Sequence, residues 1–183
     1  MKHVKLFEDF KNHEETFPSE EFAKVTGMNW LTKDWKMPGN PDEIGYNIEK
    51  WSDQLENKKT ADKASDNLIS LYKKILKLNP ELKDLGEPKS WDNILDFCRG
   101  TLSKFNLDDI KFYSNLGWDD RMKYNVGNRD LSNKINQTAQ KIALAKIKKG
   151  SDDLEKFNPH SFQVQWVMSP KTIERVKKEL KMK

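Results

Sequence analysis

Apolar residues recur at alternating spacings of three and four along much of the chain. This spacing places side chains on one face of a helix. The sequence NPDE at 40–43 can begin such a helix, because Asn accepts backbone hydrogen bonds, Pro suits the first helical position and Glu can reach back to the cap. We therefore predict a helix over about 41–57. Its buried face is expected to consist of Ile44, Ile48, Trp51 and Leu55.

The same signals divide the rest of the chain into further helices. Thr60, Ser90 and Asn106 stand where N-cap residues are expected, directly before apolar residues with helical spacing. Glycines and the pair Asn79-Pro80 stand where helices are expected to end. The predicted helices cover about 61–78, 91–100, 107–116, 118–126, 130–149 and 171–180.

Two of these helices are expected to bury a well-defined apolar face. The helix at 91–100 is expected to turn Trp91, Ile94, Leu95 and Cys98 inward. The helix at 130–149 is expected to bury a wide face that consists of Leu131, Ile135, Thr138, Ile142, Leu144, Ala145 and Ile147.

The period changes near the carboxyl end. Apolar residues alternate with polar ones from Phe162 to Met168, and this period of two predicts a strand. A single strand needs a partner, for which residues 2–7 and 111–114 are both candidates. We therefore predict a mostly α fold, a compact multi-helix domain with a minor β element near residues 161–168. A single domain is expected over 1–183, with a small helical subdomain at 1–40 as the alternative.

Composition indicates a folded chain without cysteine-based cross-links. Charged residues make up 34% of the 183 residues, but six Trp, nine Phe and four Tyr can form an aromatic-rich core. The single cysteine, Cys98, excludes an intramolecular disulfide and a zinc site built on several cysteines. No apolar run approaches the length of a membrane span, and the first ten residues do not resemble a signal peptide. We expect a cytoplasmic protein that does not bind membranes.

Charge is unevenly distributed along the chain. Residues 1–60 contain 9 basic and 12 acidic side chains, whereas residues 131–183 contain 12 basic and 5 acidic ones, a net charge of +7. Such a basic third is expected to attract an acidic protein surface or a nucleic acid. The candidate partner-binding residues in this part of the chain are Lys134, Lys141, Lys146, Lys148 and Lys149.

A second candidate binding segment has the sequence GMNWLTKDWKMPGNP at 27–41. Residues 19–41 partly resemble the winged helix-turn-helix of phage terminase small subunits and excisionases, with Thr32 opening the groove-reading helix and Trp35 one turn later. The candidate nucleic-acid-binding or partner-binding residues in this segment are Asn29, Trp30, Lys33 and Lys36, although the resemblance would place Lys33 and Lys36 at core-facing positions. The alternative interpretation is that Trp30, Leu31 and Trp35 are core residues and that Pro38-Gly39 forms a turn.

The opening sequence KLFEDF at 5–10 carries another resemblance. It is similar to the start of many small proteins from marine tailed phages, several of which are virion components. This resemblance implies a phage origin and no particular chemistry.

Residues suited to catalysis are scattered. His3, His13 and His160 have no partner at helical spacing that would help to hold a metal, and Cys98 lies on an apolar helix face. No catalytic residue, metal ligand or cofactor is predicted. The densest group of polar residues, a candidate pocket, consists of Asp119, Asp120, Arg121, Asn125 and Arg129.

Three functions follow, in order of preference. The first is a non-enzymatic interaction protein that binds a macromolecular partner and is phage-derived, either a virion component or a host-directed factor. The second is a DNA-binding protein that uses the helix-turn-helix-like segment at 19–41. The third is a hydrolase or nuclease that uses the polar cluster between Asp119 and Asp130. The oligomeric state is not predicted.

Overall fold

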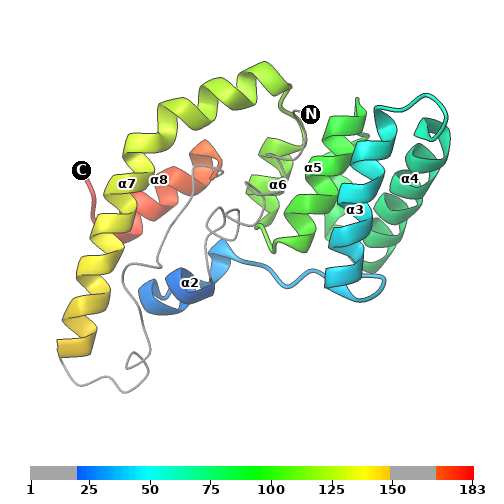
Figure 1. Cartoon of the computed structure of the whole chain (residues 1–183). Coiled ribbons are helices and arrows are strands. Elements are labelled where there is room, and N and C mark those ends of the chain that lie inside the picture. Colours follow the sequence, from blue (N-terminus) through cyan, green and yellow to red (C-terminus); the bar gives the residue numbers. More distant parts are fainter. Residues whose placement is uncertain (1–19, 149–167) are drawn as a thin grey trace. The chain divides into compact units, whose positions relative to one another are not determined.

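The structure is a computed structural model and describes residues 20–148 and 168–183. These residues are mostly helical, which confirms the predicted fold class (Figure 1). The chain divides into two compact units. We call residues 33–122 the central unit and the remaining described residues the terminal unit, and we describe each by itself. The extent of the domain over 1–183 stays a prediction.

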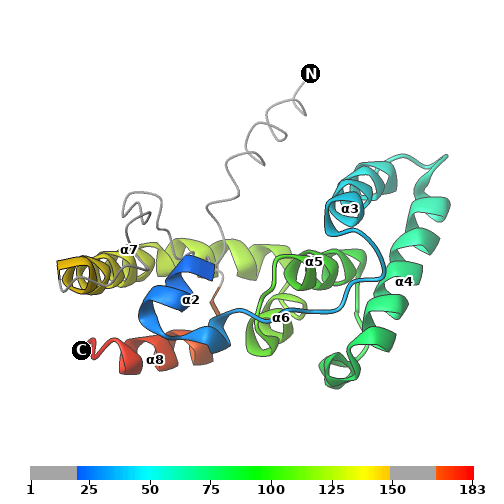
Figure 2. The ribbon, with the colours of Figure 1, turned by 90° about the horizontal axis from the view of Figure 1, so that it is seen from below.

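The central unit consists of helices that contact one another in turn. They are α3 (Pro41–Leu55), α4 (Ala61–Leu78), the 3₁₀ helix η3 (Pro80–Leu85), α5 (Trp91–Leu102) and α6 (Leu107–Tyr113). Helix α3 packs on α4 and α5, and α5 also contacts α4 and α6. The antiparallel course of α3 and α4 is visible in both ribbon views (Figures 1 and 2).

Most of the predicted caps are present in the central unit. The side chains of Asn40, Ser90 and Asn106 each accept a hydrogen bond from a backbone N–H in the first turn of the following helix. Thr60 is the exception, because its hydroxyl donates to the carbonyl of Gln54 at 2.8 Å and makes no cap for α4. The helices predicted from 41, 61, 91 and 107 are present, although α6 ends at Tyr113 and not near 116. The predicted role of Thr60 as a cap is wrong.

The core of the central unit is formed by the apolar stripe of α4 and by the inner face of α5. The α4 residues Ala64, Leu68 and Ile75 are fully buried, and the ring of Tyr72 meets Phe97 of α5 edge-on at 4.7 Å between centroids. Gly100 lies inside α5 and not at its end. A Cβ atom at this position would approach side chains of α6 and of the preceding loop to 3.2–3.3 Å, so glycine permits this close packing.

The terminal unit is formed by segments that are far apart in the sequence. They are α2 (Glu20–Thr26), the 3₁₀ helix η2 (Asn29–Leu31), the part of α7 (Trp118–Lys148) that follows Met122, and α8 (Pro170–Glu179). The two helices predicted at 118–126 and 130–149 are one continuous helix. An isolated glycine inside a helix costs about 1 kcal/mol relative to alanine, so Gly127 does not by itself end α7.

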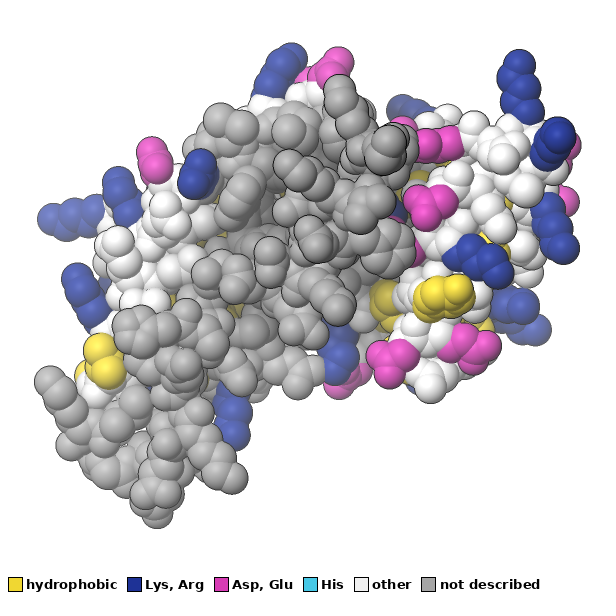
Figure 3. All heavy atoms as spheres, viewed as in Figure 1, with side chains coloured by type: hydrophobic (Ala, Val, Ile, Leu, Met, Phe, Trp, Pro, Cys, Tyr) yellow, Lys and Arg dark blue, Asp and Glu magenta, His cyan; other side chains and the backbone are white. Residues whose placement is uncertain are grey.

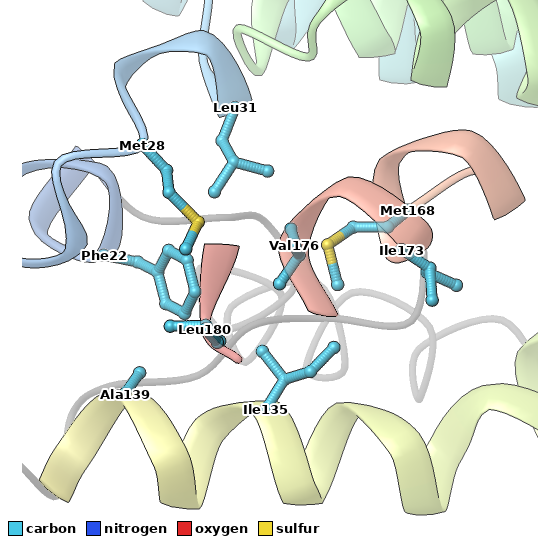
Figure 4. Packing of buried hydrophobic residues seen from close by; sticks show 9 residues of the cluster. All are labelled: Phe22, Met28, Leu31, Ile135, Ala139, Met168, Ile173, Val176 and Leu180. Atoms are coloured by element: carbon cyan, nitrogen blue, oxygen red, sulfur yellow. The ribbon is translucent and has the colours of Figure 1, made fainter. Parts of the chain in front are cut away.

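A hydrophobic cluster joins these segments (Figure 4). Phe22, Met28 and Leu31 point into it from the amino-terminal side, and α7 contributes Ile135 and Ala139. The remaining members come from α8 and its flanks, and they are Met168, Ile173, Val176 and Leu180.

The buried face of α7 is narrower than predicted. Ala139 and Ala143 are fully buried, whereas Leu144 and Ala145 are exposed. Because alanine side chains are small, the buried face of α7 has a modest apolar area. The expectation that Leu144 and Ala145 are buried was therefore wrong.

The predicted strand at 161–168 lies almost entirely outside the described residues. Only Met168 is described there, and it is a buried, non-helical residue directly before α8. The three histidines and the KLFEDF sequence also lie outside the described residues. Among the described helices, none has a stretch that is both long and apolar enough to cross a bilayer.

Candidate binding surfaces

The segment that resembles a helix-turn-helix has a different local structure. Helix α2 ends at Thr26 and is followed by Gly27, whose φ of 77° suits a glycine. The three residues of η2 then take the place of a second helix, because Thr32 is extended (φ −116°, ψ 147°) and no helix begins before Pro41. The described chain therefore offers no groove-reading helix in this segment.

Trp35 anchors the extended chain at residues 33–36, which we call the strap. Its side chain is 7% exposed, and its indole N–H donates to the carbonyl oxygen of Phe105 at 2.6 Å. The backbone N–H of Lys33 donates to the carbonyl of Lys104 at 2.9 Å. These contacts hold the strap against the loop between α5 and α6, which agrees with the interpretation of Trp35 as a core residue.

Asn79 holds the other end of the strap. Its side-chain oxygen accepts from the backbone N–H of Lys36 at 2.9 Å, and its Nδ2 donates to the carbonyls of Lys36 and Ile75, both at 2.9 Å. Asn79 is 3% exposed and follows α4 directly. One side chain therefore ends a helix and pairs with both backbone groups of a residue 43 positions away.

The lysines of the strap are at the surface. The ammonium of Lys33 lies 3.7 Å from a carboxylate oxygen of Glu81 and 5.5 Å from the centre of the Trp35 ring. Lys36 is exposed. Both lysines therefore stand on an extended segment, and the structure does not bring them together on a helix face.

Trp30, in the terminal unit, is covered by a cation. The guanidinium of Arg175 lies 3.8 Å from the centre of its ring, and Arg175 also donates to Glu179 at 3.1 Å. Trp30 is half-buried against the hydrophobic cluster, and its indole N–H is buried without a hydrogen-bond partner among the described residues. Its neighbour Asn29 is exposed. Trp30 therefore contributes mainly to packing.

Helix α7 carries the basic surface that the sequence predicts. Lys134 and Lys141 are exposed and seven residues apart, so they lie on the same side of the helix at about 10 Å along its axis. Lys148 continues this spacing, but its side chain and Lys149 lie outside the described part. Lys146 differs, because its ammonium donates to the carbonyl of Val25 at the end of α2.

The charge of the terminal unit is consistent with this surface. Its described residues, 20–32, 123–148 and 168–183, include 13 Lys and Arg against 5 Asp and Glu, a net charge of +8. Figure 3 shows mainly Lys and Arg among the described charged side chains where α7 and α8 lie. We call the exposed side of α7 that includes Lys134 and Lys141 the lysine face.

The described side chains of the polar cluster at the start of α7 are exposed and do not converge. Asp119 and Asp120 are exposed neighbours whose side chains diverge on the helix, and Arg129 is also exposed. The side chains of Arg121 and Asn125 lie outside the described part. Within the ranges that the structure describes, no group of three His, Cys, Asp or Glu side chains is arranged to hold a metal ion.

Cys98 is buried in α5, as predicted. Removal from water disfavours the thiolate and raises the pKa of the thiol to about 12, although the charge of Arg99 acts in the opposite direction. Such a thiol is a poor nucleophile at neutral pH.

We expect Cys98 to react with iodoacetamide at pH 8 only when the protein unfolds. Intact-mass spectra should show the unmodified thiol in the native protein and full alkylation in urea. Because the pKa rises from 9.0 to about 12 on folding, the unfolded chain loses its proton first as pH increases. The contribution of this thiol to stability is thus complete below about pH 9 and falls between pH 9 and 12. Rapid alkylation of the native protein would contradict this burial.

A surface hollow that sequence reasoning missed lies beside Trp91. The sequence predicts an inward Trp91, but its side chain is 38% exposed. Trp91 is the first residue of α5, and helical side chains lean toward the amino-terminal end, where no further turn of α5 covers it. The helical spacing alone could not reveal this exposure.

The hollow has a volume of about 330 Å³ and lies among three helix ends of the central unit. Its apolar lining comes from the end of α3, the start of α4 and the start of α5, and consists of Leu55, Ala61, Trp91 and Leu95. Its acidic lining consists of Glu56, Asp62 and Asp92. We call this hollow the Trp91 groove.

Comparison with known proteins adds no assignment. No protein-family model, no curated protein and no solved structure was found to match this chain.

Proposed function

We propose that this protein is a non-enzymatic interaction protein that binds an acidic protein surface through the lysine face of α7. The observation that carries the proposal is the exposed pair Lys134 and Lys141, at seven-residue spacing, in a unit whose described residues have a net charge of +8. Charge of one sign along a helix attracts a partner of the opposite sign and accelerates its association.

The chemistry of the lysine face favours a protein over a nucleic acid. Leu144 and Ala145 are exposed one turn beyond Lys141, and Leu144 is 44% exposed. From 130 to 148 the helix has no arginine for bidentate phosphate contacts and no aromatic residue for base stacking. Cations beside apolar side chains suit a partner helix that presents carboxylates and aliphatic residues at the same spacing.

The other two functions have weaker support. DNA reading by 19–41 would need a helix after Gly27, where the described chain has a 3₁₀ turn and the strap. Hydrolysis would need side chains that converge, whereas Asp119 and Asp120 diverge. The phage resemblance of the opening sequence is compatible with an interaction protein and stays a prediction.

The test uses a synthetic helical peptide with glutamate and leucine at seven-residue spacing, and a short DNA duplex as the competing probe. We expect the peptide to bind the full chain, and the double variant Lys134→Glu, Lys141→Glu to bind it about tenfold more weakly, because two attractive contacts become repulsive. Fluorescence anisotropy at two salt concentrations measures both affinities.

The matched control is Lys73→Glu with Lys77→Glu, which makes the same charge change on exposed positions of α4. We expect this control to bind the peptide nearly as well as the unchanged protein does. Equal losses in both double variants would show only a net-charge effect and would contradict the proposal. Tighter binding of the DNA duplex than of the peptide, lost in the α7 variant, would identify nucleic acid as the partner instead.

A further inference from the structure

We propose that the Trp91 groove is a second binding site, which receives a lysine or arginine side chain from an exposed segment of a partner protein. The site lies wholly within the central unit and is independent of the lysine face. Three features carry the inference: a hollow of side-chain size, an aromatic side chain at its edge and a lining whose ionised groups are all acidic.

The hollow is amphipathic in the way that a long cationic side chain requires. The aliphatic stem of lysine or arginine can lie on Leu55, Ala61 and Leu95, while its charged end stays in water. Burial of that stem removes apolar area of both partners from water. A purely apolar ligand would leave the carboxylates without a partner, and a small polar ligand would leave the apolar surface uncovered.

Trp91 is placed to contact a cation directly. It is the largest apolar side chain that the hollow exposes, and an indole face attracts guanidinium and ammonium groups more strongly than other aromatic rings do. When no ligand is bound, 38% of Trp91 is exposed, and this is unfavourable because much of its apolar surface stays in water.

The charge of the lining selects a cation over an anion. Glu56, Asp62 and Asp92 are exposed, and no Lys, Arg or His lines the hollow. The amino ends of α4 and α5 would by themselves favour an anion, but Asp62 and Asp92 occupy their first turns and offset the helix dipoles. The carboxylates are not arranged to hold a metal ion within the described residues, so an organic cation fits better.

The surface extends beyond one side chain. Trp91 also lines a second hollow of about 420 Å³, together with Pro88, Lys89 and Ile94. A ligand that spans Trp91 would therefore place neighbouring groups in both hollows. This extent suits a peptide segment with a basic residue next to apolar ones, and it exceeds what a free amino acid would cover.

The test uses a short acetylated peptide with arginine between leucine and alanine residues, added to the full chain labelled with ¹⁵N. We expect the indole N–H signal of Trp91, assigned from Trp91→Phe, to shift on titration. Asp62→Asn is expected to weaken binding about fivefold, and Trp91→Leu about tenfold. Higher salt should weaken binding as well, because the rim is exposed.

Two matched controls separate this site from general charge effects. Asp66→Asn removes the same charge from the same helix but lies outside the groove, and it should leave the affinity unchanged. A peptide with citrulline in place of arginine keeps the shape without the charge and should bind about fivefold more weakly.

The proposal is overturned by any of three results. The first is a Trp91 signal that does not respond to the arginine peptide, and the second is an equal loss of affinity in Asp62→Asn and Asp66→Asn. The third is a Trp91 signal that shifts with protein concentration before peptide is added, since this would assign the groove to a second copy of the chain. Circular dichroism of each variant checks that the helices are retained.

Discussion

Replacing Trp35 with alanine is expected to lower the free energy of unfolding by about 3–5 kcal/mol. The side chain is 7% exposed, so the variant loses buried apolar area and leaves a cavity. It also leaves the carbonyl of Phe105 without the indole donor. Urea unfolding of the full chain, followed by circular dichroism, measures the loss, and hydrogen exchange of α5 amides locates it in the central unit.

Trp35→Phe is the informative companion variant. It retains much of the packing but removes the indole N–H, so an intermediate loss of about 1–3 kcal/mol is expected. If alanine at this position costs less than about 1 kcal/mol, the strap does not contribute to the core. A phenylalanine variant as stable as the unchanged protein would mean that packing alone holds the strap.

Replacing Asn79 with alanine is expected to cost about 2–4 kcal/mol. The variant loses three hydrogen bonds at 2.9 Å, and it leaves the N–H and C=O of Lys36 without these partners in a partly buried place. Each net hydrogen bond contributes about 1 kcal/mol, and an unpaired buried group costs more. Urea unfolding measures the change, and amide exchange of Lys36 should become faster.

The matched control is Asn57→Ala. Asn57 also accepts a backbone hydrogen bond through its side chain, from Lys59 at 3.0 Å, but it is exposed. Its replacement should cost less than about 1 kcal/mol, because water can take the place of the side chain. Similar losses for Asn57→Ala and Asn79→Ala would contradict the proposed function of Asn79 as the anchor of the strap.

The features that were predictable from sequence depend on residues close together in the chain. Ser90 and Asn106 each accept from an N–H three residues later, so the residue types at short spacing are sufficient to predict the cap. Threonine is a common N-cap residue, yet the hydroxyl of Thr60 donates a hydrogen bond to the carbonyl of Gln54, six residues earlier. The turn after α3 brings the carbonyl of Gln54 within reach of Thr60, and the residues next to Thr60 in sequence do not predict this turn.

The features that sequence missed depend on distant residues. The strap is held by Asn79 and Phe105, which lie 43 and 70 positions from their partners. The predicted resemblance of residues 19–41 to a helix-turn-helix rests on spacing along the chain, whereas the conformation of the strap is fixed by these distant contacts. The Trp91 groove requires the ends of three helices, so it could not be recognised from Trp91 and its neighbours in sequence.

The lysines of α7 differ in what their side chains contact. Lys134, Lys141 and Lys146 look alike as candidate binding residues on a basic helix. Only Lys146 lies where the end of α2 presents the Val25 carbonyl, and its ammonium then caps that helix. The basic character of α7 was thus predictable, but the division of its lysines between partner binding and structure depends on tertiary packing.

The terminal unit draws its hydrophobic cluster from both ends of the described chain, whereas the central unit is continuous from 33 to 122. During synthesis, Phe22 leaves the ribosome long before Val176 and Leu180 are added to the nascent chain. The central unit is complete in that interval and can begin to fold, while Phe22 and Met28 still lack the neighbours that α7, α8 and the flanks of α8 contribute. A product that ends before Met168 would thus leave apolar side chains of Phe22, Met28 and Leu31 exposed, and such surfaces are recognised by proteolytic quality control.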